Sequence, residues 1–236
     1  MHELIFDGVP SSSFGMIITG AGVYDTPARK FQKVSIEGRN GDLIIEDDPY
    51  DVAYENIEIR YPAIIYQDYR RNRMSLSTLL SAKTGYRELE DTFEPDRFRL
   101  ATFSKMSNPK MTDHYDAGSF EITFDCKPQW FLKSGKDETT MTAGGILFNP
   151  TFQYAKPLIM VTGSGTIGLN DQTITVQNNN GTIKIDSETE NCYDEVAFRN
   201  MNVSFSDERY PRLRPGDNNI TLNGVTISII PRWFEI

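Results

Sequence analysis

The sequence predicts a mainly β protein with two domains, the first β-barrel-like with one short helix and the second a β-sandwich. Three observations lead there: long stretches alternate apolar and polar residues, one segment alone has helical spacing, and short strands with turn residues between them follow position 145. The chain has 236 residues. That length suits two modest domains, each able to bury its own core.

Three stretches of the amino-terminal half have the period of two that a half-buried strand shows. The longest runs over 119–127 and places Phe120 and Cys126 on the same apolar face. The second covers 54–61, and 31–36 is a shorter candidate. We therefore expect the first domain to be built mainly of strands.

One segment of this half departs from the strand pattern. Between Met74 and Lys83, apolar residues recur at the spacing of an amphipathic helix, at Met74, Leu76, Leu79 and Leu80. Gly85 follows as a residue that commonly ends helices. The sequence predicts a single short helix there, preceded by Arg70, Arg71 and Arg73.

The stretch from 134 to 145 is polar, contains glycine and has no periodicity, which is typical of a connector. We therefore expect a first domain at 1–133 and a second at 146–236. In the second, Asn180-Gly181 and Asn223-Gly224 have the turn chemistry of two-residue β-hairpins. The first would join 174–176 to 183–185. The second would join 220–222 to 225–229, with Leu222 opposite Val225.

Composition excludes several classes of protein. There are 24 Lys and Arg against 33 Asp and Glu, a formal charge of −9, so neither half is a basic nucleic-acid module. Charged or turn residues interrupt every apolar run, so we expect no membrane span. No basic segment precedes the first apolar stretch, and we expect no secretory signal. Cys126 and Cys192 fit no disulfide framework or zinc spacing, so we expect two reduced, half-buried thiols.

The sequence contains no convincing motif for a nucleotide-binding site or for a catalytic nucleophile. Gly163 to Gly168 has the spacing G-x-G-x-x-G, but a turn and a strand follow it where a nucleotide site needs a helix, and we interpret it as a β-turn. Ser164 lacks the first glycine of a nucleophile elbow. The two histidines, His2 and His114, are better explained as structural or exposed residues. We expect no catalytic residues and no cofactor.

Two acidic clusters were weighed as calcium ligands, and neither has the order of ligands of an EF-hand. The first surrounds Pro49-Tyr50 and the second alternates along the chain: Asp47, Asp48 and Asp51, then Asp186, Glu188 and Glu190. Solvated turn carboxylates explain both, so we expect no metal. A glycosidase pair among the 33 acids stays open, because carboxylate separation is spatial.

The arginine cluster and the two tryptophans can also be explained by structural roles. Arg70, Arg71 and Arg73 fit a solvated face, and their most plausible special use is a contact between subunits. Trp130 and Trp233 lie beside predicted strands, so we interpret them as packing residues and not as a carbohydrate platform.

The ordered motifs resemble one family across almost the whole chain: the distal tail proteins of siphophages that infect Gram-positive bacteria, or of related prophages. The most specific string is Glu37 to Leu43, which matches the G-R-[ND]-G-D-L turn of that family. Other matching strings occur in family order: Gly8-Val9, Ser13 to Met16, Arg87 to Leu89 with Asp96, Asn149-Pro150, Ala155 to Pro157, Gly163 to Gly165, Ile185 to Glu188 and Leu213 to Asn218.

The resemblance implies a structural hub at the tail tip, made and assembled in the bacterial cytoplasm and located in the virion. Such proteins form a hexameric ring that joins the tail tube and tape-measure protein to the baseplate, fibre or receptor-binding proteins. The amino-terminal domain forms the ring, and a galectin-like sandwich follows. The family string also has a local explanation, since Asn40-Gly41 supplies positive φ and Asp42 can cap the turn of Gly38, Arg39, Asn40 and Gly41.

Three functions stay open from sequence: a ring-forming hub, which the motifs favour; a carbohydrate-binding module acting on the host wall; and a cell-wall hydrolase. Short loops in the second domain leave no room for an inserted carbohydrate-binding module. The acidic charge argues against stable DNA binding, although DNA must pass a tail hub during infection.

Overall fold

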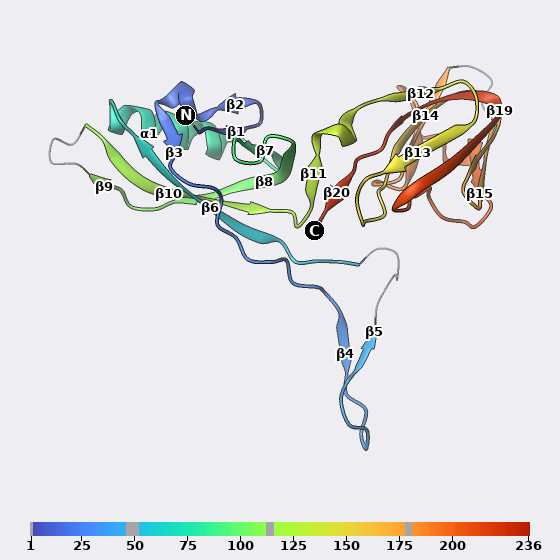
Figure 1. Ribbon diagram of the computed structural model, residues 1–236, viewed down its shortest axis with the longest axis horizontal. Helices are drawn as coiled ribbons and strands as arrows, with labels where there is room; N and C mark the ends of the chain where they lie inside the picture. Colours follow the sequence, from blue (N-terminus) through green and yellow to red (C-terminus); the bar gives the residue numbers. More distant parts are fainter. Residues whose placement is uncertain (1, 46–51, 112–115, 178–180) are drawn as a thin grey trace. The chain divides into compact units, whose positions relative to one another are not determined.

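The computed structural model describes residues 2–45, 52–111, 116–177 and 181–236 (Figure 1). The chain divides into two compact units, residues 1–130 with Ile236, and residues 131–235. All the strand pairings given below are antiparallel, and the mainly β class is confirmed. Segment 134–145, expected to be an irregular connector, instead contains the end of η2 (Lys133–Lys136) and strand β12 (Thr139–Met141), both within the second unit.

A curved antiparallel sheet forms the first unit, with the strand order β2-β1-β7-β8-β10-β6-β3 and β9 beside β10. The predicted strands at 54–61 and 119–127 are confirmed as β6 and β10, which pair from Ile57↔Cys126 to Ile65↔Gly118. The bounds are β1 (Leu4–Phe6), β2 (Val9–Pro10), η1 (Ser11–Phe14), β3 (Met16–Ile18), β6 (Ile57–Ile65), β7 (Arg87–Asp91), β8 (Arg97–Met106), β9 (Lys110–Met111) and β10 (Gly118–Cys126).

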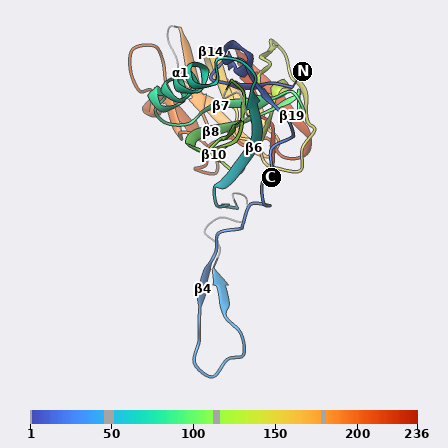
Figure 2. The ribbon, with the colours of Figure 1, turned by 90° about the vertical axis from the view of Figure 1, so that its left-hand side faces the viewer.

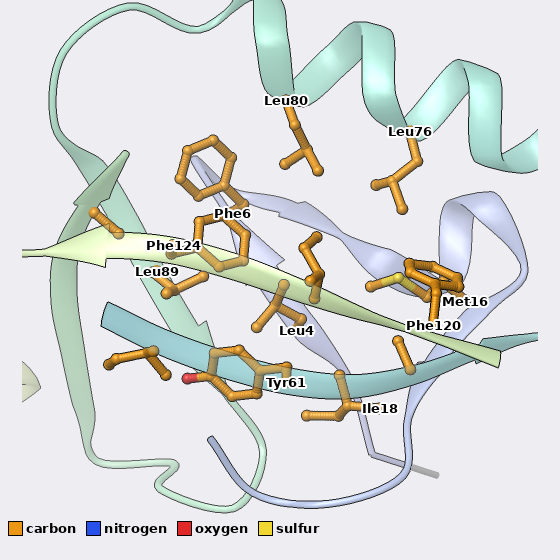
Figure 3. Packing of buried hydrophobic residues seen from close by; sticks show 14 of the residues in the cluster. Leu4, Phe6, Met16, Ile18, Tyr61, Leu76, Leu80, Leu89, Phe120 and Phe124 are labelled. Carbon is orange, nitrogen blue, oxygen red and sulfur yellow. The ribbon is translucent and has the colours of Figure 1, made fainter. Parts of the chain in front are cut away.

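One helix, α1 (Tyr69–Ala82), covers a face of this sheet. It begins five residues before the predicted segment, so the arginine cluster lies inside the helix and not ahead of it. Leu76 and Leu80 point into the core toward Phe6 and Phe120 (Figure 3). Met74 was expected on the apolar face, yet 73% of it is exposed, because the buried stripe follows Tyr69, Leu76 and Leu80.

A hydrogen bond between two buried polar side chains links strands β6 and β7 in the core of the first unit. The Tyr61 hydroxyl on β6 donates to Asp91 Oδ2 on β7 at 2.8 Å, and both residues are buried. Asp91 Oδ1 accepts the backbone amides of Phe93 and Glu94, which fixes the turn after β7. Burial, followed by the Asp91 charge, raises the pKa of Tyr61 well above its ordinary value, so the phenol stays a donor.

Two short strands, β4 (Gln32–Val34) and β5 (Leu43–Ile45), form a separate hairpin in the same unit. β4 lies within the stretch 31–36 that alternation predicted. Figures 1 and 2 show the hairpin extending away from the sheet.

The main sheet of the second unit folds over its own core, with β14 and β19 as its two long central strands, and β11 and β20 pair with each other outside this sheet. β16 pairs with the first half of β14 and β15 with the second half. β12 and β13 likewise pair with the two ends of β19. The bounds are β11 (Trp130–Leu132), β13 (Gly145–Asn149), β14 (Leu158–Leu169), β15 (Gln172–Val176), β16 (Thr182–Asp186), β17 (Asn191–Tyr193), η3 (Asn200–Asn202), β18 (Val203–Phe205), β19 (Gly216–Ile230) and β20 (Phe234–Glu235).

The expected hairpin at Asn223-Gly224 is wrong. Both halves of β19 pair with β14, and the register shifts between Gly163 and Thr166, so the strand is continuous through Gly224. Gly163 and Gly224 have φ of 102° and 76°, values that suit a bulge as well as a turn. The G-x-G-x-x-G string is likewise a bulged strand and not the predicted β-turn.

Asn180-Gly181 does not join a β-hairpin either, although Asn180 itself lies outside the described residues. β15 and β16 pair with opposite ends of β14 and not with each other. A two-residue turn would force β15 and β16 to pair directly, which the described residues do not show.

We predict that Gly165→Ala destabilises the second unit by about 3 kcal/mol, because overpacking against backbone cannot be relieved by a side-chain rotation. A Cβ there would lie 2.0 Å from the Asn223 carbonyl oxygen. Gly181→Ala is the matched control. Its φ of 91° adds strain, but the added Cβ would meet no atom within 4 Å, so we expect a loss of stability of about 1 kcal/mol. Denaturant unfolding measures both, and equal losses would contradict the crossing geometry.

Candidate assembly interface

The hairpin arm, residues 23–56, has the composition of a surface that another molecule covers. In its described part, 23–45 and 52–56, β4 and β5 pair only with each other, and an isolated two-stranded hairpin is marginally stable in water. No residue from 19 to 45 is buried. Within 31–45, five large apolar side chains are 38–53% exposed: Phe31, Ile36, Leu43, Ile44 and Ile45. Such a concentration of exposed apolar groups is typical of protein interfaces.

Residues 37–42 form most of the loop between β4 and β5. Gly38 and Gly41 have φ of 79° and 81°, the left-handed region that glycine adopts at low cost. The Arg39 amide donates to the Ile36 carbonyl across the start of this loop. Positive φ therefore falls on the two glycines, while Asn40, Arg39 and Asp42 follow ordinary backbone.

The base of the arm is fixed to the sheet at both ends. On the outgoing side, Val23 and Arg60 exchange backbone hydrogen bonds of 2.9 and 3.0 Å. On the returning side, the Asn56 amide donates to Asp125 Oδ2 at 3.0 Å and also contacts the Tyr86 hydroxyl. Both ends of the arm are thus attached to the sheet by hydrogen bonds.

Arg99 on β8 adds a buried cation at the same base. Its guanidinium lies 3.8 Å from the ring centre of Trp130 and 4.7 Å from that of Tyr24, a residue of the arm. The side chain is 1% exposed, and its Nη1 donates to the Pro128 carbonyl. Nε and Nη2 have no hydrogen-bond partner, so the aromatic faces provide much of the stabilisation that water would give.

Burial lowers the pKa of Arg99 to about 10, which still leaves it charged at neutral pH. Arg99 is not among the residues predicted from sequence. A visible clue was its position two residues before Ala101, which places a cation on the apolar face of β8.

The three arginines with a predicted subunit role do not form one compact site. Arg70 and Arg71 are exposed on the first turn of α1. Arg73 donates through Nη2 to the Ser107 carbonyl at 3.2 Å and is held against the unit. Arg70 and Arg73 line a shallow pocket together with Tyr69, Met74, Ser77 and Thr78.

The structure does not bring the residues weighed for catalysis together. His2 stacks on Phe93 with 4.0 Å between ring centres, and Ser164 lies in the bulge of β14. The two carboxylate oxygens of Asp186 accept hydrogen bonds from Nη1 and Nη2 of Arg232. His114, Asp47, Asp48 and Asp51 lie outside the described residues. Within the described ranges, no group of three His, Cys, Asp or Glu is placed to hold a metal ion.

The cysteines and Trp233 are structural. Cys126 and Cys192 belong to different units and are 0% and 1% exposed, so the expectation of half-buried thiols is corrected to fully buried ones. Burial raises the pKa of Cys126 to about 12 and that of Cys192 to about 11, which keeps both protonated and unreactive. Trp233 packs in the core of the second unit, as predicted.

The fold is similar to that of a phage protein of known structure. The chain superimposes on the crystal structure of the Dit protein (gp 19.1) of phage SPP1, a hub of the adsorption apparatus in phages that infect Gram-positive bacteria. The TM-score is 0.73 at 15% identity, with 100% of both chains covered. A structure of the phage p2 baseplate aligns at a TM-score of 0.48 and 8% identity over 97% of each chain. The likeness to the SPP1 protein shows a shared fold along the whole chain.

Neither a family model nor a curated protein sequence matches the chain. None of the helices in the described ranges has the length and apolar character that crossing a lipid bilayer requires.

We predict that Arg99→Lys destabilises the first unit by about 2 kcal/mol, because an ammonium group cannot stack between two rings as a planar guanidinium does. Amide exchange at Val23 and Arg60 should accelerate as the arm base loosens. Arg71→Lys on the exposed helix face should change stability by less than about 0.5 kcal/mol. Unchanged exchange at the arm base in Arg99→Lys would show that the stack does not hold the arm.

Proposed function

We propose that the protein is a structural hub at the distal end of a siphophage tail, and that the arm carries its self-assembly. The whole-chain fold likeness to the SPP1 hub supports the tail location. The observation that carries the assembly proposal is the arm, with five exposed apolar side chains on a hairpin that has no second layer. Apolar side chains exposed together in this way are typical of a surface that another protein covers.

A closed ring needs heterologous contacts, in which one patch meets a different patch on the next copy. The arm is suited to this because its base is fixed on the sheet while its strands are exposed on both faces. We propose a ring of six copies, with each arm covering part of a neighbouring amino-terminal unit. Exposed Arg70 and Arg71 would contribute a polar contact at the same interface, and the Gly38–Asp42 string would be the structural turn of the arm.

The two units correspond in this proposal to two domains. The first, near residues 1–130, forms the ring, and the second is a galectin-like sandwich that faces other tail components. The partners would be tail tube and tape-measure proteins on one side and fibre or receptor-binding proteins on the other. The role is structural and non-enzymatic, in a virion component assembled in the bacterial cytoplasm.

We predict a light-scattering mass of six copies for the purified protein at high concentration, and loss of that mass in Ile44→Asp. Ile44 on β5 is 53% exposed, and a carboxylate there would be buried without a partner in the assembled ring. Val196→Asp removes an exposed apolar residue from the second unit and should leave the mass unchanged. A six-copy mass for Ile44→Asp would exclude the arm as the ring contact, and a monomer at every wild-type concentration would exclude the unaided hexamer.

We also predict no stable binding of double-stranded DNA. Each copy has a formal charge of −9, so the mean field of any oligomer repels a phosphate polymer. The measurement is an electrophoretic mobility shift at low ionic strength, where attraction would be strongest. A salt-sensitive shift that disappears in the Arg70→Gln, Arg71→Gln double variant would contradict this and show that a local basic surface outweighs the net charge.

A further inference from the structure

The second unit displays three large apolar side chains on one short loop. Val196, Phe198 and Met201 are 89%, 73% and 99% exposed, within six residues of one another along the chain. We call residues 194–202 the knob. Exposure this complete is unusual for apolar residues, which normally keep at least one face against the protein.

The knob is held rigidly. Asp194 Oδ1 accepts the amides of Val196 and Ala197 at 2.9 and 2.8 Å, and Arg199 Nε donates to Asp194 Oδ2 at 2.7 Å. The amides of Ala197 and Val196 and the Arg199 side chain lower the pKa of Asp194 to about 2, so these bonds persist at neutral pH.

The far end of the knob is hydrogen-bonded to Gln177, the residue that follows strand β15. Asn202 donates through Nδ2 to the Gln177 carbonyl at 2.9 Å, and the Gln177 amide returns a bond of 2.8 Å to the Asn202 carbonyl. The Asn200 side chain accepts the Cys192 amide at the start of the loop. A loop ordered in this way loses little conformational entropy when a partner covers it, which is what a binding surface needs.

The segment of the chain that contains the knob is acidic, and the nearest basic residues beyond its ends are Lys184 and Arg209. Seven of the 33 Asp and Glu of the chain lie within 186–208, against Arg199 as the one basic residue of that segment. Asp186 pairs with Arg232 and Asp194 with Arg199. Five acids of the segment are exposed: Glu188, Glu190, Glu195, Asp207 and Glu208.

We propose that the knob is a docking site for a second tail protein whose surface has an apolar pocket rimmed by Lys or Arg. The apolar side chains would fill the pocket and the acids would meet its rim. Charge argues against the other occupants: a second knob would bring like charges together, and an anionic lipid surface would repel the segment. This inference rests on the proposed tail location, and names the surface through which the second unit would hold a partner.

The test places a photoreactive phenylalanine analogue at Met201 in the full chain, expressed in cells that supply the other tail proteins, with adducts mapped by mass spectrometry of purified tails. We expect one adduct, on a tail protein other than this chain, at a site flanked by Lys or Arg. An adduct within the same chain, on a second copy or on no protein would overturn the proposal. Absence of the chain from purified tails would overturn the tail location and this inference together.

A substitution series separates docking from folding. In the Phe198→Ser, Met201→Ser double variant, we expect at least a tenfold loss of the cross-linked partner from purified tails, with the chain itself still incorporated and its oligomeric mass unchanged. Phe152→Ser is the matched control, because Phe152 is 92% exposed in the same unit but lies outside the acidic segment. Equal partner loss in the control, or full partner content in the double variant, would contradict a specific site at the knob.

Discussion

A hairpin of two strands has no second layer against which to bury its side chains, and this constraint governs the amino-terminal unit. Within that unit, the apolar residues of β4 and β5 stay exposed, while the sheet beneath α1 buries most of its own apolar face. The unit therefore contains one self-sufficient core and one structure that lacks a core. The apolar side chains of the arm remain in contact with water after folding. Covering them with another surface would remove that apolar area from water, which favours association.

An arm that has no core of its own depends on the contacts at its base for its attachment to the sheet. The backbone bonds between Val23 and Arg60 and the side-chain bond from Asn56 to Asp125 fix part of the base of the arm, and the stack of Tyr24, Arg99 and Trp130 fixes the rest. A buried guanidinium with two unpaired nitrogens is costly unless its aromatic neighbours stay in place. The position of Tyr24 is thereby linked to the integrity of the unit, which keeps the base of the arm ordered.

The carboxy-terminal unit solves a different problem, which is how two long strands can belong to both halves of one folded sheet. Close backbone approach at Gly165 and the positive φ of Gly163 and Gly224 let β14 and β19 bend together while staying paired. The same glycines suggested a nucleotide loop and a hairpin when considered in sequence. Glycine marks unusual backbone without saying whether the chain turns back or continues, because a bulge and a tight turn use the same positive φ.

Periodicity by itself determined the β class, the faces of β6 and β10 and the existence of one helix, since side-chain alternation is a local property that burial then selects. The turn at Gly38–Asp42 was recognisable for the same reason, because its glycines have a local conformational role. Strand partners, the buried setting of Arg99 and the rigid display of the knob were decided only by tertiary structure. Each depends on groups far apart in the chain, such as Tyr24 with Trp130 or Gln177 with Asn202, and no local pattern records which distant group a residue will meet.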